Sequence, residues 1–256
     1  MTDPITSPHN PRVKLVRQLQ RQAKTRRQQQ RLVLEGVRLI TDALDSGAVP
    51  DFLCFSGDAS PVQETVTRAS GDGILCLPVT EDLLRDMADT ETPQGVLGVF
   101  PWPDLAYPDP PARVIVADGW RDPGNLGTML RTAAAAGVDL VVLAPGTVDV
   151  FNPKCIRAGM GAQFRVPVRA WSWDKLQTHL ADHHIFLAAA QGDQPYDTVD
   201  WPALCTIIVG SEAHGPSAHA TALAYSTLYI PMQPGAESLN AAVAASLLIY
   251  ASRRTG

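Results

Sequence analysis

The 256-residue sequence lacks the features that would carry a chain into or across a membrane. Its first twelve residues hold no apolar run of the signal-peptide kind. No later stretch reaches a membrane-spanning length without charged residues or proline. We therefore expect a globular protein of the cytoplasm, with 45% apolar residues to build its core.

Cysteine is scarce and scattered. The four residues, Cys54, Cys76, Cys155 and Cys205, form no C-x-x-C pair, and each lies in or beside an apolar segment. Such spacing favours buried free thiols over disulfides. We therefore expect no metal site.

Aromatic residues make up only 6% of the chain, and few of them lie in its most basic stretch. Residues 1–40 contain nine Lys or Arg against Asp3 and Glu35, a balance of +7 in a chain of net charge −5, which leaves −12 for the remainder. This asymmetry predicts that the basic end contacts nucleic acid or another acidic surface. The scarcity of aromatics favours phosphate contact over base stacking. A solvated helix whose charges only keep the chain soluble is the alternative.

A proline-rich segment divides the chain. Before it, Val13, Val16 and Leu19 have helical spacing within the very polar residues 13–30, which predicts an exposed or partner-bound helix. Short apolar runs and a few helical stretches then indicate a small α/β unit. Five prolines among residues 100–112 can continue neither a helix nor a central strand. We expect one domain over 1–100, a linker over 101–112 and a second domain over 113–256. A loop within a single domain is the other interpretation.

The second domain shows short apolar runs separated by helix-compatible stretches. The runs lie at residues 114–117, 140–143, 164–168, 185–189, 206–209 and 227–230. Continuous apolar strands that alternate with helices predict a parallel sheet covered on both faces. Because ligands in such sheets bind beyond the carboxyl ends of the strands, the loops after these runs are candidate sites.

Three of these segments are unusually rich in glycine, proline and polar residues: 118–133, 210–216 and 230–240. Taken one at a time, each has an ordinary interpretation. Arg131 could form an ion pair, Glu212 could cap a helix, and Ser238 could cap the C-terminal helix after a plain strand-to-helix connection.

Taken together, the loops resemble the three signature motifs of the SpoU family of RNA ribose 2′-O-methyltransferases, in the SPOUT superfamily. N-x-G-x-x-x-R is matched by Asn125, Gly127 and Arg131; G-x-E-x-x-G by Gly210, Glu212 and Gly215; and I-P-M followed by S-L-N by Ile230, Pro231, Met232, Ser238, Leu239 and Asn240. Asn10-Pro11, Glu35-Gly36 and the segment 92–96 resemble the N-terminal substrate-binding module of the family.

The resemblance implies an α/β fold with a parallel sheet and a C-terminal deep trefoil knot, plus a small N-terminal α/β RNA-binding domain. The knot would be formed by the loops after Val209 and Met232 together with the helix after Ser238. A homodimer through the knotted region is also implied. The Ala-rich helix from Ala241 onward has small side chains that would allow close packing there.

The implied reaction transfers the methyl group of S-adenosylmethionine to a ribose 2′-hydroxyl of RNA, and the N-terminal module favours ribosomal RNA. The implied catalytic residues are Arg131, Asn125, Glu212, Ser238 and Asn240. The implied cofactor-binding residues are Ala189, Gly192, Gly210, Ile230, Met232, Ser238 and Leu239, of which Ala189 and Gly192 rest on position only. The candidate RNA contacts are Arg12, Lys14, Arg26, Arg27, Lys154 and Arg157.

The role of Arg131 is open between a base and a group that stabilises charge. Because a guanidinium stays protonated, we expect it to hold the phosphate beside the target ribose and to stabilise developing alkoxide charge. A transfer RNA substrate is an alternative, as is an RNA-binding protein of the same fold without catalysis. A dinucleotide-binding enzyme is disfavoured because no G-x-G-x-x-G follows the run at residues 114–117.

Overall fold

The structure, a computed structural model of the chain, describes residues 3–212, 214–235 and 238–253. The chain forms two compact units, of which the first comprises Met1–Pro103 with Phe151–Ile156, and the second Asp104–Val150 with Arg157–Gly256. The proline-rich segment is therefore shared: Pro101 ends a strand of the first unit, and the residues from Asp104 onward belong to the second.

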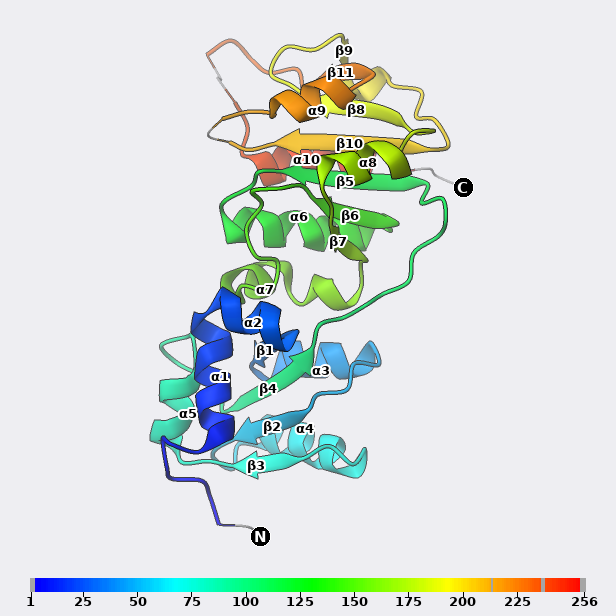
Figure 1. The fold of residues 1–256 in the computed structure, drawn as a ribbon. Coiled ribbons are helices and arrows are strands. Elements are labelled where there is room, and N and C mark those ends of the chain that lie inside the picture. The colour runs from blue at the N-terminus through cyan, green and yellow to red at the C-terminus, as the bar shows by residue number, and fades with distance from the viewer. Residues whose placement is uncertain (1–2, 213, 236–237, 254–256) are drawn as a thin grey trace. The chain divides into compact units, whose positions relative to one another are not determined.

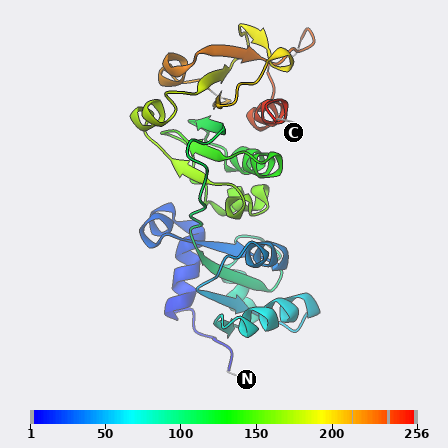
Figure 2. The ribbon, with the colours of Figure 1, turned by 90° about the vertical axis from the view of Figure 1, so that its right-hand side faces the viewer.

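The first unit is built on a four-stranded mixed sheet. Its strand order is β1 (Arg31–Glu35), β4 (Val96–Pro101), β2 (Phe52–Phe55), β3 (Cys76–Pro78). β4 is antiparallel to both β1 and β2, whereas β2 and β3 are parallel. Helices α3 (Val37–Asp45) and α4 (Ser60–Gly71) cover one face, and α1 (Pro11–Arg21) lies on the other, as Figure 2 shows.

The N-terminal helical region belongs to the core of this unit. It forms α1 and α2 (Ala23–Gln29), separated by Gln22 in an extended conformation. Val13, Val16 and Leu19 are buried in one hydrophobic cluster with residues of α5 (Glu81–Met87) and of the sheet. The expectation of an exposed or partner-bound helix is wrong, because this apolar stripe packs inside its own domain.

The second unit is built on a seven-stranded sheet in which every observed pair of strands is parallel. Its strand order is β7 (Val168–Ala170), β6 (Leu140–Leu143), β5 (Arg113–Asp118), β10 (Cys205–Gly210), β8 (His184–Ala188), β11 (Ser226–Tyr229), β9 (Gln194–Pro195). The prediction of an α/β fold with a parallel sheet is confirmed.

The strand predicted at residues 164–168 is wrong. A 3₁₀ turn, η1 (Ala162–Phe164), occupies the start of that segment, and the strand begins only at Val168. Pro167 explains the delay, because a residue without an N–H cannot donate to a sheet ladder. Its carbonyl nevertheless accepts a hydrogen bond from Val141 N at 2.9 Å, which leads the chain into β7.

Helices cover both faces of this sheet (Figure 1). α6 (Pro123–Ala136) and α10 (Ala241–Ala251) pack against each other on one face, and α8 (Trp173–His179) and α9 (Ala218–Leu223) lie on the other. A 3₁₀ turn, η2 (Tyr196–Thr198), also belongs to this unit, whereas α7 (Pro153–Gly159) is divided between the two units after Ile156.

The order of the strands places a topological switch point in the middle of this sheet. From β5 the chain proceeds outward through β6 to β7, whereas β10 and β8 lie on the other side of β5. Ligands bind beyond the carboxyl ends of the strands at such a point. The loops that follow β5 and β10 are therefore where a site is expected.

Candidate active site

The loop after β5 leads directly into the first turn of α6. Asp122 is the N-cap of this helix, and its Oδ1 accepts a hydrogen bond from Asn125 N at 2.8 Å. Pro123 occupies the first helical position, where a missing N–H costs nothing. This cap fixes Asn125 at the exposed N-terminus of α6.

The loop after β10 folds back on itself at once. Ser211 and Gly215 pair with each other, with Gly215 N donating to Ser211 O at 2.9 Å. A Cβ added to Gly210 would lie 2.4 Å from Pro216 N, so only glycine allows the chain to return this closely. The tight return presents Glu212 at the carboxyl edge of the sheet.

The loop after β11 ends at the N-terminus of α10. Asn240 is the N-cap, and its Oδ1 accepts hydrogen bonds from Ala242 N at 3.0 Å and Val243 N at 3.3 Å. The prediction that Ser238 caps this helix is therefore wrong by two residues. Both residue types are good caps, but the helical conformation begins only at Ala241.

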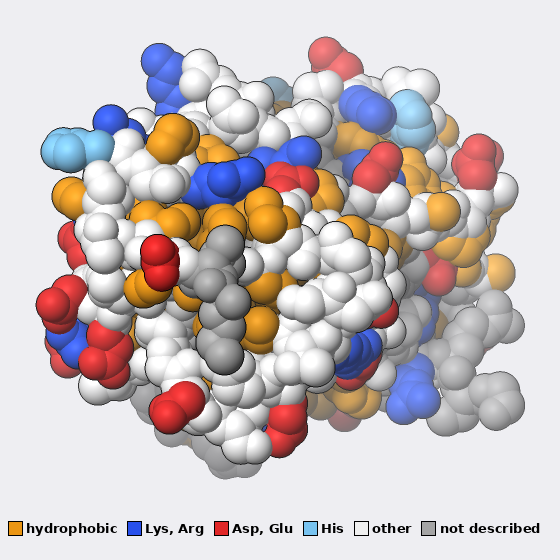
Figure 3. Space-filling model, turned by 90° about the horizontal axis from the view of Figure 1, so that it is seen from below, with side chains coloured by type: hydrophobic (Ala, Val, Ile, Leu, Met, Phe, Trp, Pro, Cys, Tyr) orange, Lys and Arg blue, Asp and Glu red, His pale blue; other side chains and the backbone are white. Residues whose placement is uncertain are grey.

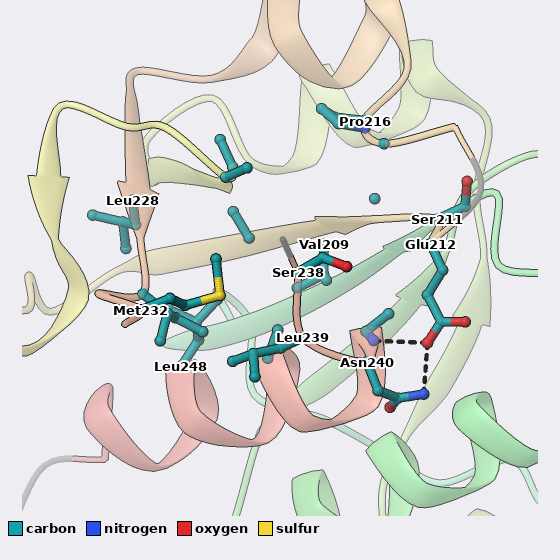
Figure 4. A pocket seen from close by; sticks show the side chains of 18 residues that line it. Val209, Ser211, Glu212, Pro216, Leu228, Met232, Ser238, Leu239, Asn240 and Leu248 are labelled. Atoms are coloured by element: carbon teal, nitrogen blue, oxygen red, sulfur yellow. Dashed lines mark hydrogen bonds between the residues drawn. The ribbon is translucent and has the colours of Figure 1, made fainter. Parts of the chain in front are cut away.

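The three loops meet at a single carboxylate oxygen, as Figure 4 shows in part. Glu212 Oε1 accepts hydrogen bonds from Asn125 Nδ2 at 2.8 Å, Asn240 Nδ2 at 2.6 Å and Ala241 N at 2.8 Å. Asn240 Nδ2 also lies 3.1 Å from Asn125 Oδ1. Glu212 therefore caps α10, as one ordinary interpretation proposed, and it also joins residues more than one hundred positions apart in the sequence.

A cavity of about 530 Å³ lies beside this network; we call it the main cavity. Apolar side chains from the ends of β8, β10 and β11 and from α10 form most of its wall, and Ser211, Glu212, Ser238 and Asn240 form a polar side. Six of the predicted cofactor residues line it: Ala189, Gly210, Ile230, Met232, Ser238 and Leu239.

Gly192 does not line the main cavity but supports its rim. A Cβ at this position would lie 2.9 Å from the backbone carbon of Leu228, so the segment packs closely on β11. The next residue, Asp193, accepts hydrogen bonds from Thr227 N and Thr227 Oγ1, both at 2.8 Å. The bond from the backbone N–H, followed by that from the hydroxyl, lowers the pKa of Asp193. These contacts hold the loop that carries Ala189 and Ala190 against the sheet.

Arg131 does not take part in the hydrogen-bond network around Glu212. It is exposed on α6, six positions after Asn125, which places it about 120° away around the helix. It does not line the main cavity, and within the described residues its side chain makes no hydrogen bond or ion pair. The structure therefore brings together Asn125, Glu212, Ser238 and Asn240 but leaves Arg131 on another face.

The basic residues proposed to contact RNA differ in their availability. Arg12, Lys14 and Arg27 are exposed. Arg26 is only 3% exposed, and its Nη1 donates to Leu19 O at 2.6 Å and Gln20 O at 3.1 Å. Its assignment as an RNA contact is wrong, because its guanidinium closes the end of α1 instead.

The other basic candidates lie on α7, where Lys154 is exposed and Arg157 is half-buried. On the face drawn in Figure 3, basic and acidic side chains are interspersed. The described residues of this face therefore form no continuous basic patch.

Two residues that support the site were not predicted. Asp118, at the end of β5, accepts a hydrogen bond from Ser217 N at 2.6 Å and so fixes the segment after the Glu212 loop. Trp120 is buried, and its Nε1 donates to Val209 O at 2.8 Å. Their position directly after a buried strand was the only available signal.

The described residues contain no cluster of three or more His, Cys, Asp or Glu residues that could hold a metal ion. The four cysteines are free thiols, and burial raises the pKa of Cys54 to about 12. In the part of the chain that is described, no helix is long and apolar enough to cross a membrane.

Comparison with solved structures defines the class. The chain is similar to the S-adenosylmethionine-bound structure of an rRNA methyltransferase from Sinorhizobium meliloti, with a TM-score of 0.86, 28% identity, and coverage of 98% of this chain and 97% of the other. With the site at the carboxyl edge of the sheet, this likeness identifies an S-adenosylmethionine-dependent methyltransferase with a SPOUT-type domain.

The family follows from the sequence comparisons. Residues 112–250 match the SpoU rRNA Methylase family, and residues 10–98 match the MRM3-like substrate binding domain. The chain belongs to the SpoU family, and the resemblance seen in its three motifs is confirmed.

Two curated relatives cover both domains. A mitochondrial rRNA methyltransferase 3 of Mus musculus is 36% identical over 90% of this chain and 68% of its own length. A 23S rRNA (guanosine(2553)-2′-O)-methyltransferase of Bacillus subtilis is 35% identical over 96% of this chain and 97% of its own.

The main cavity fits S-adenosylmethionine in size and chemistry. Its volume of about 530 Å³ lies within the range of about 300–1,000 Å³ typical of small-molecule sites. Apolar walls suit an adenine ring, and the carboxylate and hydroxyl groups on its polar side suit the cationic, polar end of the molecule. When bound, this cofactor supplies an electrophilic methyl group.

Proposed function

We propose that this protein transfers the methyl group of S-adenosylmethionine to a ribose 2′-hydroxyl of ribosomal RNA. The observation that carries the proposal is the shared hydrogen-bonding of Asn125, Asn240 and the α10 N-terminus to Glu212 beside the main cavity. A relative that covers nearly the whole chain is named as a 23S rRNA 2′-O-methyltransferase, which supports large-subunit ribosomal RNA as the first substrate to test.

The division of work among the residues follows from where they lie. The apolar residues at the ends of β8, β10 and β11 would hold the cofactor, with Gly210 keeping the second loop close. Glu212, Asn125 and Asn240 form a rigid group that fixes the mouth of the site, and Ser238 lines the same cavity. Fixing reacting groups in a productive geometry lowers the barrier because little reorganisation remains to be done.

Arg131 would act on the RNA and not on the cofactor. Its guanidinium is exposed and uses none of its donors on another described side chain, so it is free to form a forked contact with a phosphate. Held beside the target ribose, the same charge would stabilise developing alkoxide character at the 2′-oxygen.

We also propose a homodimer through the C-terminal unit. A groove of about 300 Å³ between α6 and α10 is lined by Thr128, Ala242, Val243, Ser246, Leu247 and Tyr250. Val243, Leu247 and Tyr250 are 47%, 37% and 50% exposed, an apolar stripe that a second copy would cover. Arg131 follows Thr128 by three positions, so it borders this groove.

The face of α10 proposed for this contact differs from the sequence expectation. Ala241, Ala242 and Ala245 are buried within their own unit, and α10 packs on α6, so these small residues serve the fold of one chain. The larger residues on the other side of α10 are those left for a partner. The trefoil knot remains a prediction that rests on the family resemblance.

For the first unit we propose RNA binding over residues 1–100, with Arg12, Lys14 and Arg27 as contacts. The match to a substrate-binding domain supports this role. Lys154 and Arg157 of α7 are proposed separately as RNA contacts. Four free thiols suit a reducing compartment, which supports a cytoplasmic location that cell fractionation would test.

The proposed function can be tested by comparing 2′-O-methylated nucleosides in ribosomal and transfer RNA from cells with and without this gene. We expect one ribose-methylated nucleoside of ribosomal RNA to disappear. Its disappearance from transfer RNA instead would reassign the substrate. Loss of no such nucleoside, together with no binding of S-adenosylmethionine by calorimetry, would identify an RNA-binding protein without catalysis.

A further inference from the structure

A second cavity, of about 200 Å³, lies directly beside the main one, and we call it the side cavity. Its lining consists of Trp120, Arg121, Asp122, Asn125, Ser211, Glu212, His214 and Ala241. Ser211, Glu212 and Ala241 line both cavities. The two spaces therefore meet at Glu212, so a group in one would face a group in the other across this carboxylate.

The side cavity is lined by charged groups of both signs. Glu212 lies in the wall shared with the main cavity, whereas Arg121, His214 and the α6 cap Asp122 line the side cavity alone. Only one of the carboxylate oxygens of Glu212 is used: Oε1 accepts all three of its hydrogen bonds, and no described residue donates to Oε2. The shared wall can thus accept a further hydrogen bond, and the guanidinium of Arg121 can supply positive charge.

The side chains of Arg121 and His214 do not stabilise the surrounding fold through polar contacts. Both are exposed, and to other described residues neither side chain makes a hydrogen bond or ion pair. Asp122, by contrast, caps α6, and Trp120 is tied to β10 through Val209. His214 is held in place through its backbone, since its N–H donates to Ser211 Oγ at 3.3 Å.

We propose that the side cavity receives the ribose of the target nucleotide, with Arg121 and His214 as positioning residues that hold its phosphate; this inference rests on the proposed function. A sugar hydroxyl is a hydrogen-bond donor and matches the free oxygen of Glu212. A phosphate is an anion and matches the guanidinium of Arg121. At about 200 Å³ the cavity takes a single ring and not a whole nucleotide. The base would therefore remain outside.

The test uses the full-length protein with Arg121→Ala, Arg121→Lys and His214→Ala, an unmodified 23S rRNA transcript, and S-adenosylmethionine. Arg253→Ala and His219→Ala are matched controls: Arg253 is exposed just beyond the far end of α10, an 11-residue helix about 16 Å long, and His219 lies on α9. Cofactor affinity is measured by calorimetry, RNA affinity by anisotropy at several salt concentrations, and methyl transfer by kcat and KM.

For Arg121→Ala we expect a KM for RNA about tenfold higher, equivalent to ~1.4 kcal/mol, with unchanged cofactor affinity. The slope of log affinity against log salt should fall by about one, as loss of one phosphate contact predicts. Arg121→Lys should recover most of the loss, since a phosphate accepts a point charge. His214→Ala should change KM in the same direction, and both controls should match the parent.

Unchanged KM and salt slope in both alanine variants would overturn the proposal, as would loss of cofactor binding, which would assign these residues to the main cavity. If the parent binds the transcript but transfers no methyl group, the proposed function fails. The salt slope of Arg121→Ala still decides whether this residue contacts a phosphate.

Discussion

In the N-terminal unit, several charged side chains pair with groups of their own fold, whereas in the C-terminal unit a carboxylate and two carboxamides are gathered at the exposed carboxyl edge of a sheet. Arg26 closes the end of α1, Arg17 pairs with Asp86, and Arg31 pairs with Asp51 at 2.5 Å. Glu212 instead joins three loops beside a cavity. Charge along the sequence is therefore a poor guide to a site, and the position of a polar residue after a buried strand is a better one.

The largest effect on activity is expected from a substitution at Glu212, which should separate the C-terminal site from the N-terminal charge pairs most clearly. Glu212→Gln can keep an oxygen facing the N–H groups of Asn125, Asn240 and Ala241, but it removes the negative charge that strengthens these three hydrogen bonds. We expect methyl transfer to fall by about 100-fold, as for loss of one preorganised group in an active site. Single-turnover kinetics would measure this effect.

Glu64→Gln is the matched control for this change, because Glu64 accepts a hydrogen bond from Ser60 on an exposed helix of the N-terminal unit. It should retain full activity. A Glu212→Gln enzyme as active as this control would mean that the network does not organise the reaction.

Arg26→Met tests the claim that Arg26 stabilises the fold and does not contact RNA. Methionine keeps the apolar stem but leaves Leu19 O and Gln20 O without the donors they now have from Arg26. We expect the free energy of unfolding to fall by about 1–3 kcal/mol, measured with urea.

Arg27→Met is the paired variant, one position along on the exposed face of the same helix. It should leave the stability unchanged and weaken RNA binding. Equal stability of both variants would show that the buried contacts of Arg26 contribute nothing.

Arg131→Lys asks whether the exposed arginine of α6 acts through its shape or its charge. We expect a loss of about tenfold in kcat, ~1.4 kcal/mol, because lysine cannot make the forked contact that a guanidinium offers a phosphate. The RNA KM and kcat should be measured together. Near-normal turnover would show that a point charge is sufficient.

The smallest expected effect is on stability and concerns the amino-terminal ends of the strands of the C-terminal sheet, where a buried histidine precedes β8. Burial lowers the pKa of His183, against smaller opposing effects of the Cys205 backbone and Asp182, and its Nδ1 lies 2.9 Å from Thr206 Oγ1. The folded protein thus favours the neutral ring, whereas the unfolded chain takes up a proton near pH 6.5. Stability is full above that pH and declines as the pH falls below it toward the lowered folded value.

Melting temperatures between pH 5 and pH 8 would measure this decline. His183→Asn should make the profile less steep, with the rest of the decline due to His184, whose pKa is also lowered by burial. His179→Asn, which changes an exposed histidine on α8, should leave the profile unchanged. A profile unchanged by His183→Asn would assign the decline to other groups.

Much of the C-terminal site could be predicted because its residues follow buried strands. The apolar runs located β5, β10 and β11, and parallel strands bring the loops after them to one edge, so Asn125, Glu212 and Asn240 meet there. The choice between Ser238 and Asn240 as the cap could not be made, because both are good caps two positions apart. The late start of β7 depended on Pro167, whose effect was missed.

The N-terminal unit was harder to predict for a physical reason. A charged side chain looks the same in the sequence whether its head group faces solvent or closes a helix end. Only the turn from α1 into α2 brings Arg26 back onto Leu19 O and Gln20 O, where it is buried. The same holds for Val13, Val16 and Leu19, whose apolar stripe could have faced a partner as well as its own domain.

The most direct test of the account is to incubate the purified protein with an unmodified 23S rRNA transcript and S-adenosylmethionine carrying a labelled methyl group, and then to hydrolyse the RNA with alkali. Cleavage by alkali requires a free 2′-hydroxyl. We therefore predict that the label is recovered in an alkali-resistant dinucleotide, and that Glu212→Gln lowers its yield about 100-fold. Label recovered in mononucleotides, which would place the methyl group on a base, would contradict the account.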